Sequence, residues 1–223
     1  MKKINALLIA ILVVTMVSES FAQVFGVKGG LNLSNQIIKD NDGTSSDDFK
    51  MNPGFHIGAT AEFPLSDLLS FETGLLLSTK GYKFSISETE LGQTVETKGS
   101  TNLLYLDIPI TAKAYFDLSS VKVYGIVGPY IGIGLSGKSK LEMSGDGVSL
   151  TVKETLKWGS GAEDHYRRLD YGLIVGAGVA INSIEVGLTY GLGLANISAE
   201  TDNGAKVNNR VLGITVGYKF GTK

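Results

Sequence analysis

Apolar residues alternate with small or polar residues along most of this chain. Near the C-terminus, Leu212, Ile214, Val216, Tyr218 and Phe220 are separated by single glycine, threonine or lysine residues. Successive side chains of a β-strand point to opposite faces, so this period of two predicts two-faced strands. Similar segments lie at 25–33, 55–63, 71–78, 104–116, 121–136, 169–181 and 184–195, with 121–136 the least regular. We therefore expect an all-β fold of eight antiparallel strands.

The connections between these segments are short and long in turn. The short ones are 64–69, 117–120 and 182–183, and the long polar ones are 34–53, 81–102, 137–167 and 196–210. Transmembrane β-barrels show this asymmetry, with short periplasmic turns and long extracellular loops. An even number of strands then places both ends of the barrel on the periplasmic side.

Alternation alone also fits a soluble barrel of the lipocalin type, whose apolar face points inward. The second face of these segments is mostly Gly, Ser, Thr and Ala, which suits a narrow barrel interior better than a water-exposed surface. In lipid the sheet must close, because unpaired amide groups cost several kcal/mol each. We predict a closed eight-stranded antiparallel transmembrane β-barrel with short periplasmic turns and long extracellular loops. Pro109 cannot donate a ladder hydrogen bond, which predicts a bulge at that position.

Aromatic residues gather at the two ends of the expected strands, as in the interfacial girdles of membrane barrels. The lipid-interface aromatics expected at the periplasmic end are Phe25, Phe63, Phe71, Phe116, Tyr218 and Phe220. Those expected near the other end are Phe55, Tyr82, Tyr105 and Tyr171.

The N-terminus has the layout of an export signal. Lys2 and Lys3 precede an apolar run over 4–17, and small residues at 20 and 22 suit cleavage before Gln23. The alternative is a membrane anchor, but the run is shorter than the ~20 residues that a spanning helix needs. We expect a signal peptide at 1–22, an outer-membrane β-barrel domain at 23–223, and a place in the outer membrane of a Gram-negative bacterium.

Composition removes several classes of function. The chain has no cysteine, two histidines and a formal net charge of −2 without a basic stripe. A disulfide framework, a thiolate metal site and nucleic-acid binding are therefore not expected. We expect no cofactor and no metal. The group 163–165 (EDH) and His56 are the only catalytic candidates, and no hydrolase motif accompanies them.

Inward-facing charges fall into two groups once strand directions are assigned. The periplasmic group is Lys28, Glu62, Glu72, Lys113, Glu185 and Lys219, and the outer group is Lys80, Asp107, Arg168 and Asp170, with His56 nearby. Strand adjacency predicts the pairs Glu62–Lys28, Glu72–Lys113, Glu185–Lys219 and Lys80–Asp107. Buried charges are tolerated when they are paired. These residues are structural ion pairs that fill the lumen or, alternatively, a gate or ion path.

Five short segments carry a resemblance to a known family: 26–32 (GVKGGLN), 71–75 (FETGL), 105–109 (YLDIP), 176–178 (GAG) and 217–220 (GYKF). Through them the chain resembles the porin-like outer-membrane β-barrel domain family, of the small eight-stranded type. The resemblance implies a fold and a membrane, and it implies no catalytic residues.

Three classes of function stay open from the sequence. The first is a structural or surface-interaction protein that presents its long loops, and the second is a narrow porin for ions or small solutes. The third is an outer-membrane enzyme, which we do not expect. The expected partners are outer-membrane lipid, the barrel-insertion machinery during assembly, and an extracellular ligand of unknown identity. A glycine-rich lining leaves room for water, whereas inward Leu76 and Ile174 act as filler.

Overall fold

The computed structural model describes residues 23–41, 43, 50–90, 93–145, 148–161 and 163–220. Its elements are nine strands and one short 3-10 helix. They are β1 (Val24–Lys39), β2 (Asn52–Pro64), β3 (Leu69–Glu90), β4 (Gln93–Leu118), β5 (Val121–Gly145), β6 (Val148–Thr155), β7 (Leu169–Ile181), β8 (Ile184–Gly193), η3 (Asp202–Gly204) and β9 (Lys206–Lys219). The signal peptide expected at 1–22 lies outside the described residues.

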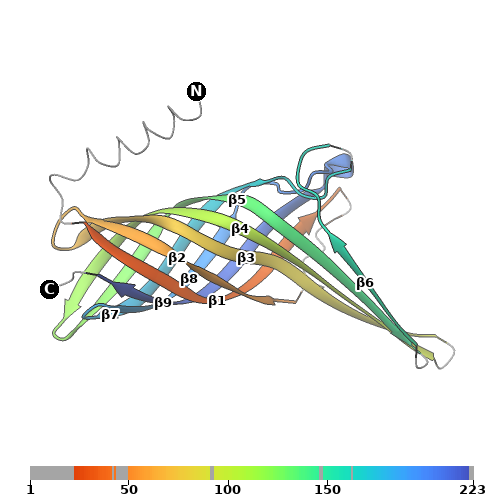
Figure 1. The fold of residues 1–223 in the computed structure, drawn as a ribbon, viewed down its shortest axis with the longest axis horizontal. Helices are drawn as coiled ribbons and strands as arrows, with labels where there is room; N and C mark the ends of the chain where they lie inside the picture. Colours follow the sequence, from red (N-terminus) through yellow and green to blue (C-terminus); the bar gives the residue numbers. More distant parts are fainter. Residues whose placement is uncertain are drawn as a thin grey trace.

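Eight of the nine strands close into a barrel (Figure 1). Each is antiparallel to its neighbours in the order β4-β3-β2-β1-β9-β8-β7-β5, and β4 pairs with β5 to complete the ring. The first strand meets the last over a long register, from Gly26 opposite Lys219 to Lys39 opposite Lys206. The predicted eight-stranded antiparallel barrel is confirmed. The ninth strand, β6, lies outside the ring and pairs with β5.

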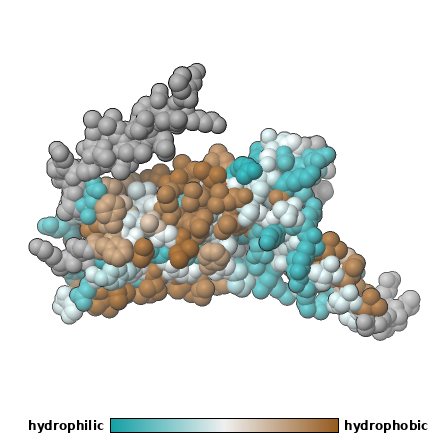
Figure 2. Space-filling model, in the orientation of Figure 1, coloured by the Kyte–Doolittle hydropathy of each residue, from teal (hydrophilic) through white to brown (hydrophobic). Residues whose placement is uncertain are grey.

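The apolar face of the strands forms the outer wall. On β9, Ile214, Val216 and Tyr218 are exposed, whereas their neighbours Gly213 and Gly217 are buried. Figure 2 shows the resulting hydrophobic band on one face of the barrel, with hydrophilic residues beyond it. Burying this band in hydrocarbon removes a large apolar surface from water.

Two of the segments expected to be long loops form β-strands over much of their length. Residues 81–90 and 93–102 form the outer halves of β3 and β4, and 137–145 and 148–155 form the outer half of β5 and all of β6. Their alternation is carried largely by Ser, Thr and Lys, which made them look like polar loops. Gly81, whose φ of 143° suits glycine, marks the point where β3 leaves the barrel.

The bulge expected at Pro109 is also wrong. Pro109 pairs in register with Tyr130 of β5, and the register shifts instead between Leu104 and Tyr105. On the β3 side, the pairing resumes on both sides of Pro109 without a shift, because the β3 residues opposite it are simply left unpaired. Its carbonyl oxygen accepts a hydrogen bond from Thr73 Oγ1 at 2.8 Å. The missing donor is therefore accommodated without an inserted residue.

Among the described residues, no helix is long and apolar enough to cross a membrane.

The barrel has one end with tight turns and one with long projections. The tight turns join β2 to β3, β4 to β5 and β7 to β8, and Ser119 and Asn182 in two of them adopt positive φ. The opposite end carries the extended strands and the long connections (Figure 1). By the usual asymmetry of membrane barrels, the tight turns face the periplasm.

We predict that an epitope inserted after Gly145 is labelled by antibody on intact cells. The reason is that Gly145 ends β5 at the far tip of the projecting strands. The same epitope in the turn between β7 and β8, at Asn182, should be labelled only after the outer membrane is permeabilised. The opposite pattern would reverse the orientation of the barrel.

A second prediction concerns the outer wall. Val216→Lys places a charge in the lipid-facing band and should lower the free energy of unfolding in lipid vesicles by about 2–4 kcal/mol. Ser87→Lys, on the projecting part of β3, is the matched control and should change it by less than about 0.5 kcal/mol. Urea titration measures both values, and an equal cost at the two sites would contradict the assignment of the lipid-facing wall.

Candidate functional site

The lumen is lined by the small and polar face of the eight strands, and six charged residues cross it near the periplasmic end. We call these six the periplasmic cluster: Lys28 (β1), Glu62 (β2), Glu72 (β3), Lys113 (β4), Glu185 (β8) and Lys219 (β9). Three are cations and three are anions, so the cluster is electrically neutral. Because six of the eight barrel strands contribute one residue each, the cluster spans the whole cross-section.

Lys113 lies at the centre of the periplasmic cluster. Its side chain is fully buried, and Nζ lies 2.7 Å from Glu185, 3.1 Å from Glu72 and 3.5 Å from Glu62. It also lies 4.3 Å from the ring centroid of Tyr124, which adds a cation–π contact. A buried ammonium group needs such partners, because its hydration is lost. One lysine therefore holds three carboxylates in place.

The other two lysines of the cluster complete the network from its edges. Lys28 Nζ lies 2.5 Å from Glu72 and 3.6 Å from Glu185. Lys219 Nζ lies 2.6 Å from Glu62 and 2.8 Å from Glu185. Every carboxylate in the cluster thus contacts at least two lysines, which balances the desolvation of the anions.

The structure brings together three of the four pairs expected from strand adjacency. They are Glu72–Lys113, Glu185–Lys219 and Lys80–Asp107. The pair Glu62–Lys28 is wrong, because Lys28 reaches across to Glu72 and Glu62 binds Lys219 and Lys113. Glu62 lies directly opposite Glu72 in the pairing of β2 with β3, so these two anions need cations from elsewhere in the ring. Long lysine side chains can span the lumen, and adjacency along the sheet does not limit them.

Tyrosines complete the periplasmic cluster, and the sequence analysis missed them. Tyr115 Oη donates to Glu62 at 2.8 Å and lies 3.2 Å from Glu185, and Lys219 donates to the same hydroxyl at 2.5 Å. Tyr124 is buried beside Lys113. The signal was present in the alternation, because Tyr115 follows Lys113 at a spacing of two on the same strand and so shares its inward face.

A second charged group, which we call the outer cluster, lies further along the lumen. Lys80 Nζ donates to Asp107 at 2.9 Å and to Asp170 at 3.0 Å, and it lies over the ring of Tyr130 at 4.4 Å. Asp170 also accepts hydrogen bonds from Tyr130 Oη at 3.1 Å and Asn209 Nδ2 at 3.0 Å. The outer cluster has one cation and two carboxylates.

Arg168 was expected in the same group, and this prediction is wrong. It is exposed at the base of the loop before β7, and its guanidinium donates to the carbonyl oxygen of Gly134 at 3.1 Å. Arg168 is two residues before Asp170, and in a strand the two side chains would point to the same side. However, β7 begins only at Leu169. The two-residue period therefore does not apply to Arg168.

A small cavity of about 120 Å³, lined by both polar and apolar side chains, separates the two clusters. Its polar wall includes His56, whose Nδ1 lies 2.8 Å from Asn32 Oδ1 and whose Nε2 lies 3.0 Å from Thr215 Oγ1. Leu76 and Ile174 line it as well, as expected from the inward face of their strands. Such a cavity is large enough for several water molecules.

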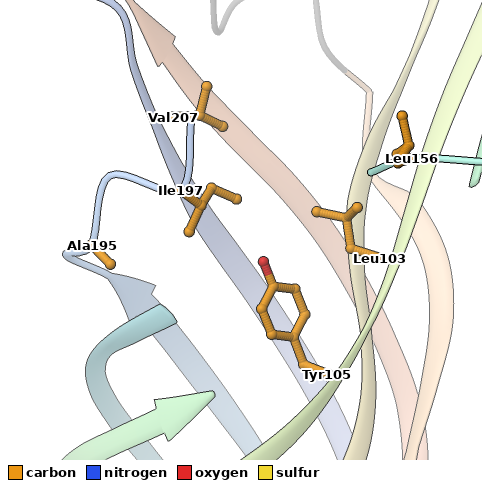
Figure 3. Close-up of a cluster of buried hydrophobic side chains, with 6 residues drawn as sticks. All are labelled: Leu103, Tyr105, Leu156, Ala195, Ile197 and Val207. Carbon is orange, nitrogen blue, oxygen red and sulfur yellow. The ribbon is translucent and has the colours of Figure 1, made fainter. Parts of the chain in front are cut away.

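An apolar cap covers the outer end of the lumen. It consists of Leu103, Tyr105, Leu156, Ala195, Ile197 and Val207, with Trp158 and Tyr166 packed against it (Figure 3). Its residues come from β4, from β9 and from the connections on either side of the β7–β8 pair, which fold over the mouth. The backbone joins them, since Arg167 N–H donates to Ile197 at 2.8 Å and Ile197 N–H donates to Val207 at 2.9 Å.

The cap corrects the expectation for Tyr105. This residue is fully buried inside the barrel and does not face lipid. Its odd number places it on the same inward face of β4 as Asp107 and Lys113, and its ring meets Trp158 edge-on at a centroid distance of 5.5 Å. The sequence analysis missed the cap because half of it, namely Leu156, Ala195 and Ile197, lies outside the strands.

The six aromatics expected at the periplasmic interface all lie at the end with the tight turns. Phe25, Phe116, Tyr218 and Phe220 are exposed on the outer wall. Phe63 and Phe71 are directly opposite one another, with ring centroids 6.1 Å apart. At the other end, Phe55 and Tyr171 are exposed.

The catalytic candidates do not come together. His56 lies in the lumen, whereas His165 lies in the loop before β7, where its Nε2 is 3.4 Å from Glu154 and its Nδ1 accepts from Lys157 N–H at 3.2 Å. Glu163 binds Lys157 at 2.8 Å, and Asp164 accepts from Gly161 N–H at 2.8 Å. In the part of the chain that the structure describes, no group of three His, Asp or Glu side chains is placed to hold a metal ion.

A closed barrel with an apolar outer wall and a filled lumen defines the class of protein, and sequence comparison identifies the family. The model of the outer membrane protein beta-barrel domain matches residues 21–199, most of the chain. The chain belongs to this family and is a protein of the bacterial outer membrane. A search of curated proteins gives no match.

Several solved structures are similar to this chain. Ail, the attachment invasion locus protein of Yersinia pestis, is 18% identical over 88% of this chain and 98% of its own, with a TM-score of 0.30. Neisserial surface protein A is 16% identical over 88% of this chain and 97% of its own, with a TM-score of 0.36. An outer membrane channel from Pseudomonas putida F1 is 14% identical over 91% and 98%, with a TM-score of 0.30.

We predict that Lys113→Met lowers the free energy of unfolding by about 3–5 kcal/mol, because it leaves three buried carboxylates with two lysines. Lys122→Met is the matched control, since Lys122 makes only an exposed pair with Asp117 at 3.3 Å and should cost less than about 0.5 kcal/mol. Denaturant titration in vesicles measures both. Equal effects of the two changes would mean that the cluster does not stabilise the barrel.

Proposed function

We propose that the barrel is closed to diffusion and that the protein acts through its extracellular surface, in a structural or surface-interaction role. The observation that carries this proposal is that side chains fill the lumen at two levels. The periplasmic cluster fills it at one end, and the apolar cap covers the other end. An eight-stranded barrel encloses an interior that side chains can just fill, whereas diffusion porins use about 16–18 strands.

Each barrier obstructs solutes for a different reason. In the periplasmic cluster the charges already satisfy one another, so a passing ion would have to displace an ion pair such as Lys113–Glu185 at 2.7 Å. At the apolar cap an ion would lose its hydration without gaining a ligand. The cavity of about 120 Å³ between them is lined by Lys28 and Glu72 of the periplasmic cluster and by Lys80 and Asp107 of the outer cluster.

The partners follow from the two outer surfaces. The apolar wall faces outer-membrane lipid, and the projecting strands and loops face the exterior, where an extracellular ligand of unknown identity would bind. We propose further that residues 1–22 are a signal peptide removed on export, that 23–223 form the mature barrel domain, and that the barrel-insertion machinery assembles it.

A narrow pore is the second candidate, and the hydroxyl groups on the wall of the cavity are the observation in its favour. Thr60, Thr189 and Thr215 line that cavity, and hydroxyl groups can replace the water around an ion. In this case the periplasmic cluster is the gate, with the ion pairs of Glu72 and Glu185 as its movable parts. An enzymatic role has the least support, because His56 and His165 lie in separate environments with partners of their own.

The conductance of single channels in planar bilayers tests the closed barrel. Wild type should conduct little, and Glu185→Ala should raise the conductance, because it removes a partner of Lys28, Lys113 and Lys219. Adding Ile197→Asp, which places a charge in the cap, should raise it further.

Glu96→Ala is the control for this experiment, since the partners of Glu96 are Lys98 and Ser85, which lie beyond the barrel and away from the lumen. Its conductance should equal that of wild type. A large and steady wild-type conductance, unchanged by Glu185→Ala or Glu72→Ala, would show an open lumen and favour the porin instead.

A further inference from the structure

The strands that project beyond the barrel form a small sheet of their own (Figure 1). We call it the extension: residues 82–90 of β3, 93–101 of β4, 138–145 of β5 and 148–155 of β6. Within it β3 pairs with β4, β4 with β5, and β5 with β6. It continues the barrel wall outward on one side of the mouth.

The two faces of the extension differ in chemistry. The cross-strand registers place one row of apolar residues on the face that continues the lumen side, namely Phe84, Ile86, Val95, Leu141, Met143, Val148, Leu150 and Val152. Val148 and Leu150 are 71% and 55% exposed, and hydrophobic residues are visible on the extension in Figure 2. A water-exposed apolar row of this length marks an interaction surface.

The opposite face carries charges that pair among themselves. Lys98 binds Glu96 at 2.8 Å and Lys140 binds Glu142 at 2.5 Å. Hydrogen bonds from these lysines hold the pKa of Glu96 and the pKa of Glu142 below their usual values. This face is therefore well suited to contact with water, and the apolar face and its edge are the parts that lack a covering.

β6 forms one edge of the extension and is open to a further strand. It pairs with β5 on one side, and all eight of its residues are exposed. Its other side pairs with no strand in the described part of the chain. Edge strands are normally protected by charges or proline. The charges of β6 are Lys153 and Glu154, both near the barrel, so its outer half, Val148–Val152, is unprotected.

The outer half of β6 is complementary to itself. In an antiparallel pair centred on Leu150, this residue lies opposite its own copy, and Val148 lies opposite Val152 on the same face. Ser149 lies opposite Thr151 on the other face. A register shifted by one step of the two-residue period would place Val148 against Glu154 instead. Matching apolar and polar pairs stabilise such a strand pair, and the two-fold symmetry closes the contact.

The membrane then decides where the second copy lies. The two-fold axis of an antiparallel strand pair is perpendicular to the sheet. Because the extension continues the barrel wall, this perpendicular points outward from the barrel and runs parallel to the membrane. Rotation by 180° about such an axis inverts the second molecule. The two barrels therefore sit in two membranes that face one another.

We propose that β6 of this protein pairs with β6 of a second copy in a facing outer membrane, so that the extension joins two membranes. The two apolar faces then form one continuous sheet surface across the contact, and the edge amide groups of both strands are satisfied. The proposal rests on the surface role proposed above and names its partner.

Clustering of vesicles tests the proposal. Full-length protein is reconstituted into phosphatidylcholine vesicles, and clustering is followed by light scattering, with protein-free vesicles as the baseline. Wild-type vesicles should cluster with one another and not with protein-free vesicles. Leu150→Lys and Leu150→Glu each place like charges opposite one another at the two-fold axis, so each variant alone should return the scattering to the baseline.

The mixture of the two variants is the decisive measurement. Leu150→Lys vesicles mixed with Leu150→Glu vesicles should cluster again, because lysine then faces glutamate. Val95→Lys is the matched control, since Val95 lies on the same apolar face two strands from the edge and its change should preserve clustering. Protease cleavage of the extension shows that all variants are inserted and oriented alike.

Three outcomes would overturn the proposal. They are clustering with protein-free vesicles, which indicates lipid binding; failure of the mixture to recover; and equal loss in Val95→Lys, which indicates docking on the face rather than pairing at the edge. The single-channel conductance of the same preparations separates this failure from that of the proposed function, because a closed lumen in wild type does not depend on Leu150.

Discussion

In a lipid bilayer every backbone amide and carbonyl group must find its hydrogen-bond partner within the protein. The pairing of β1 with β9 and of β4 with β5 meets this requirement by leaving no open edge in the barrel. The other features of the molecule follow from that closure. The ring has one face toward hydrocarbon, which must be apolar, and one face toward a lumen too narrow for bulk water, which side chains must fill.

The way the lumen is filled combines opposite chemistries. Near the periplasm, lysines and carboxylates neutralise one another around Lys113, and tyrosines supply hydroxyl groups and ring faces. At the outer mouth, Ile197 and Leu103 form an apolar cap with their neighbours. Charges suit the deep interior because the rigid wall holds their partners at fixed distances. Apolar residues suit the mouth because connections of irregular shape can fold together there.

The period-two alternation predicted the eight strands, the lipid-facing wall and the inward position of all six residues of the periplasmic cluster. Strand adjacency predicted three of the four expected ion pairs but not the contacts across the lumen, since Lys28 reaches over to Glu72 and not to the next strand. The alternation also failed to predict two parts of the structure: the strands that extend into water, and the apolar cap. The outer half of β3 alternates Ser with Phe84 and Ile86 in water, and the residues of the cap, such as Ile197, come from irregular segments.

The six residues of the periplasmic cluster come from β1, β2, β3, β4, β8 and β9. Several of its ion pairs join strands on opposite sides of the β1–β9 junction, because Glu62 on β2 binds Lys219 of β9 and Glu185 on β8 binds Lys28 of β1. If β1 and β9 separate, buried anions lose their counter-charges together with the backbone pairing. Opening the pairing between β1 and β9 at any point therefore strains the entire ring. The barrel is held together as a single cooperative unit, and partially opened forms are too costly to accumulate.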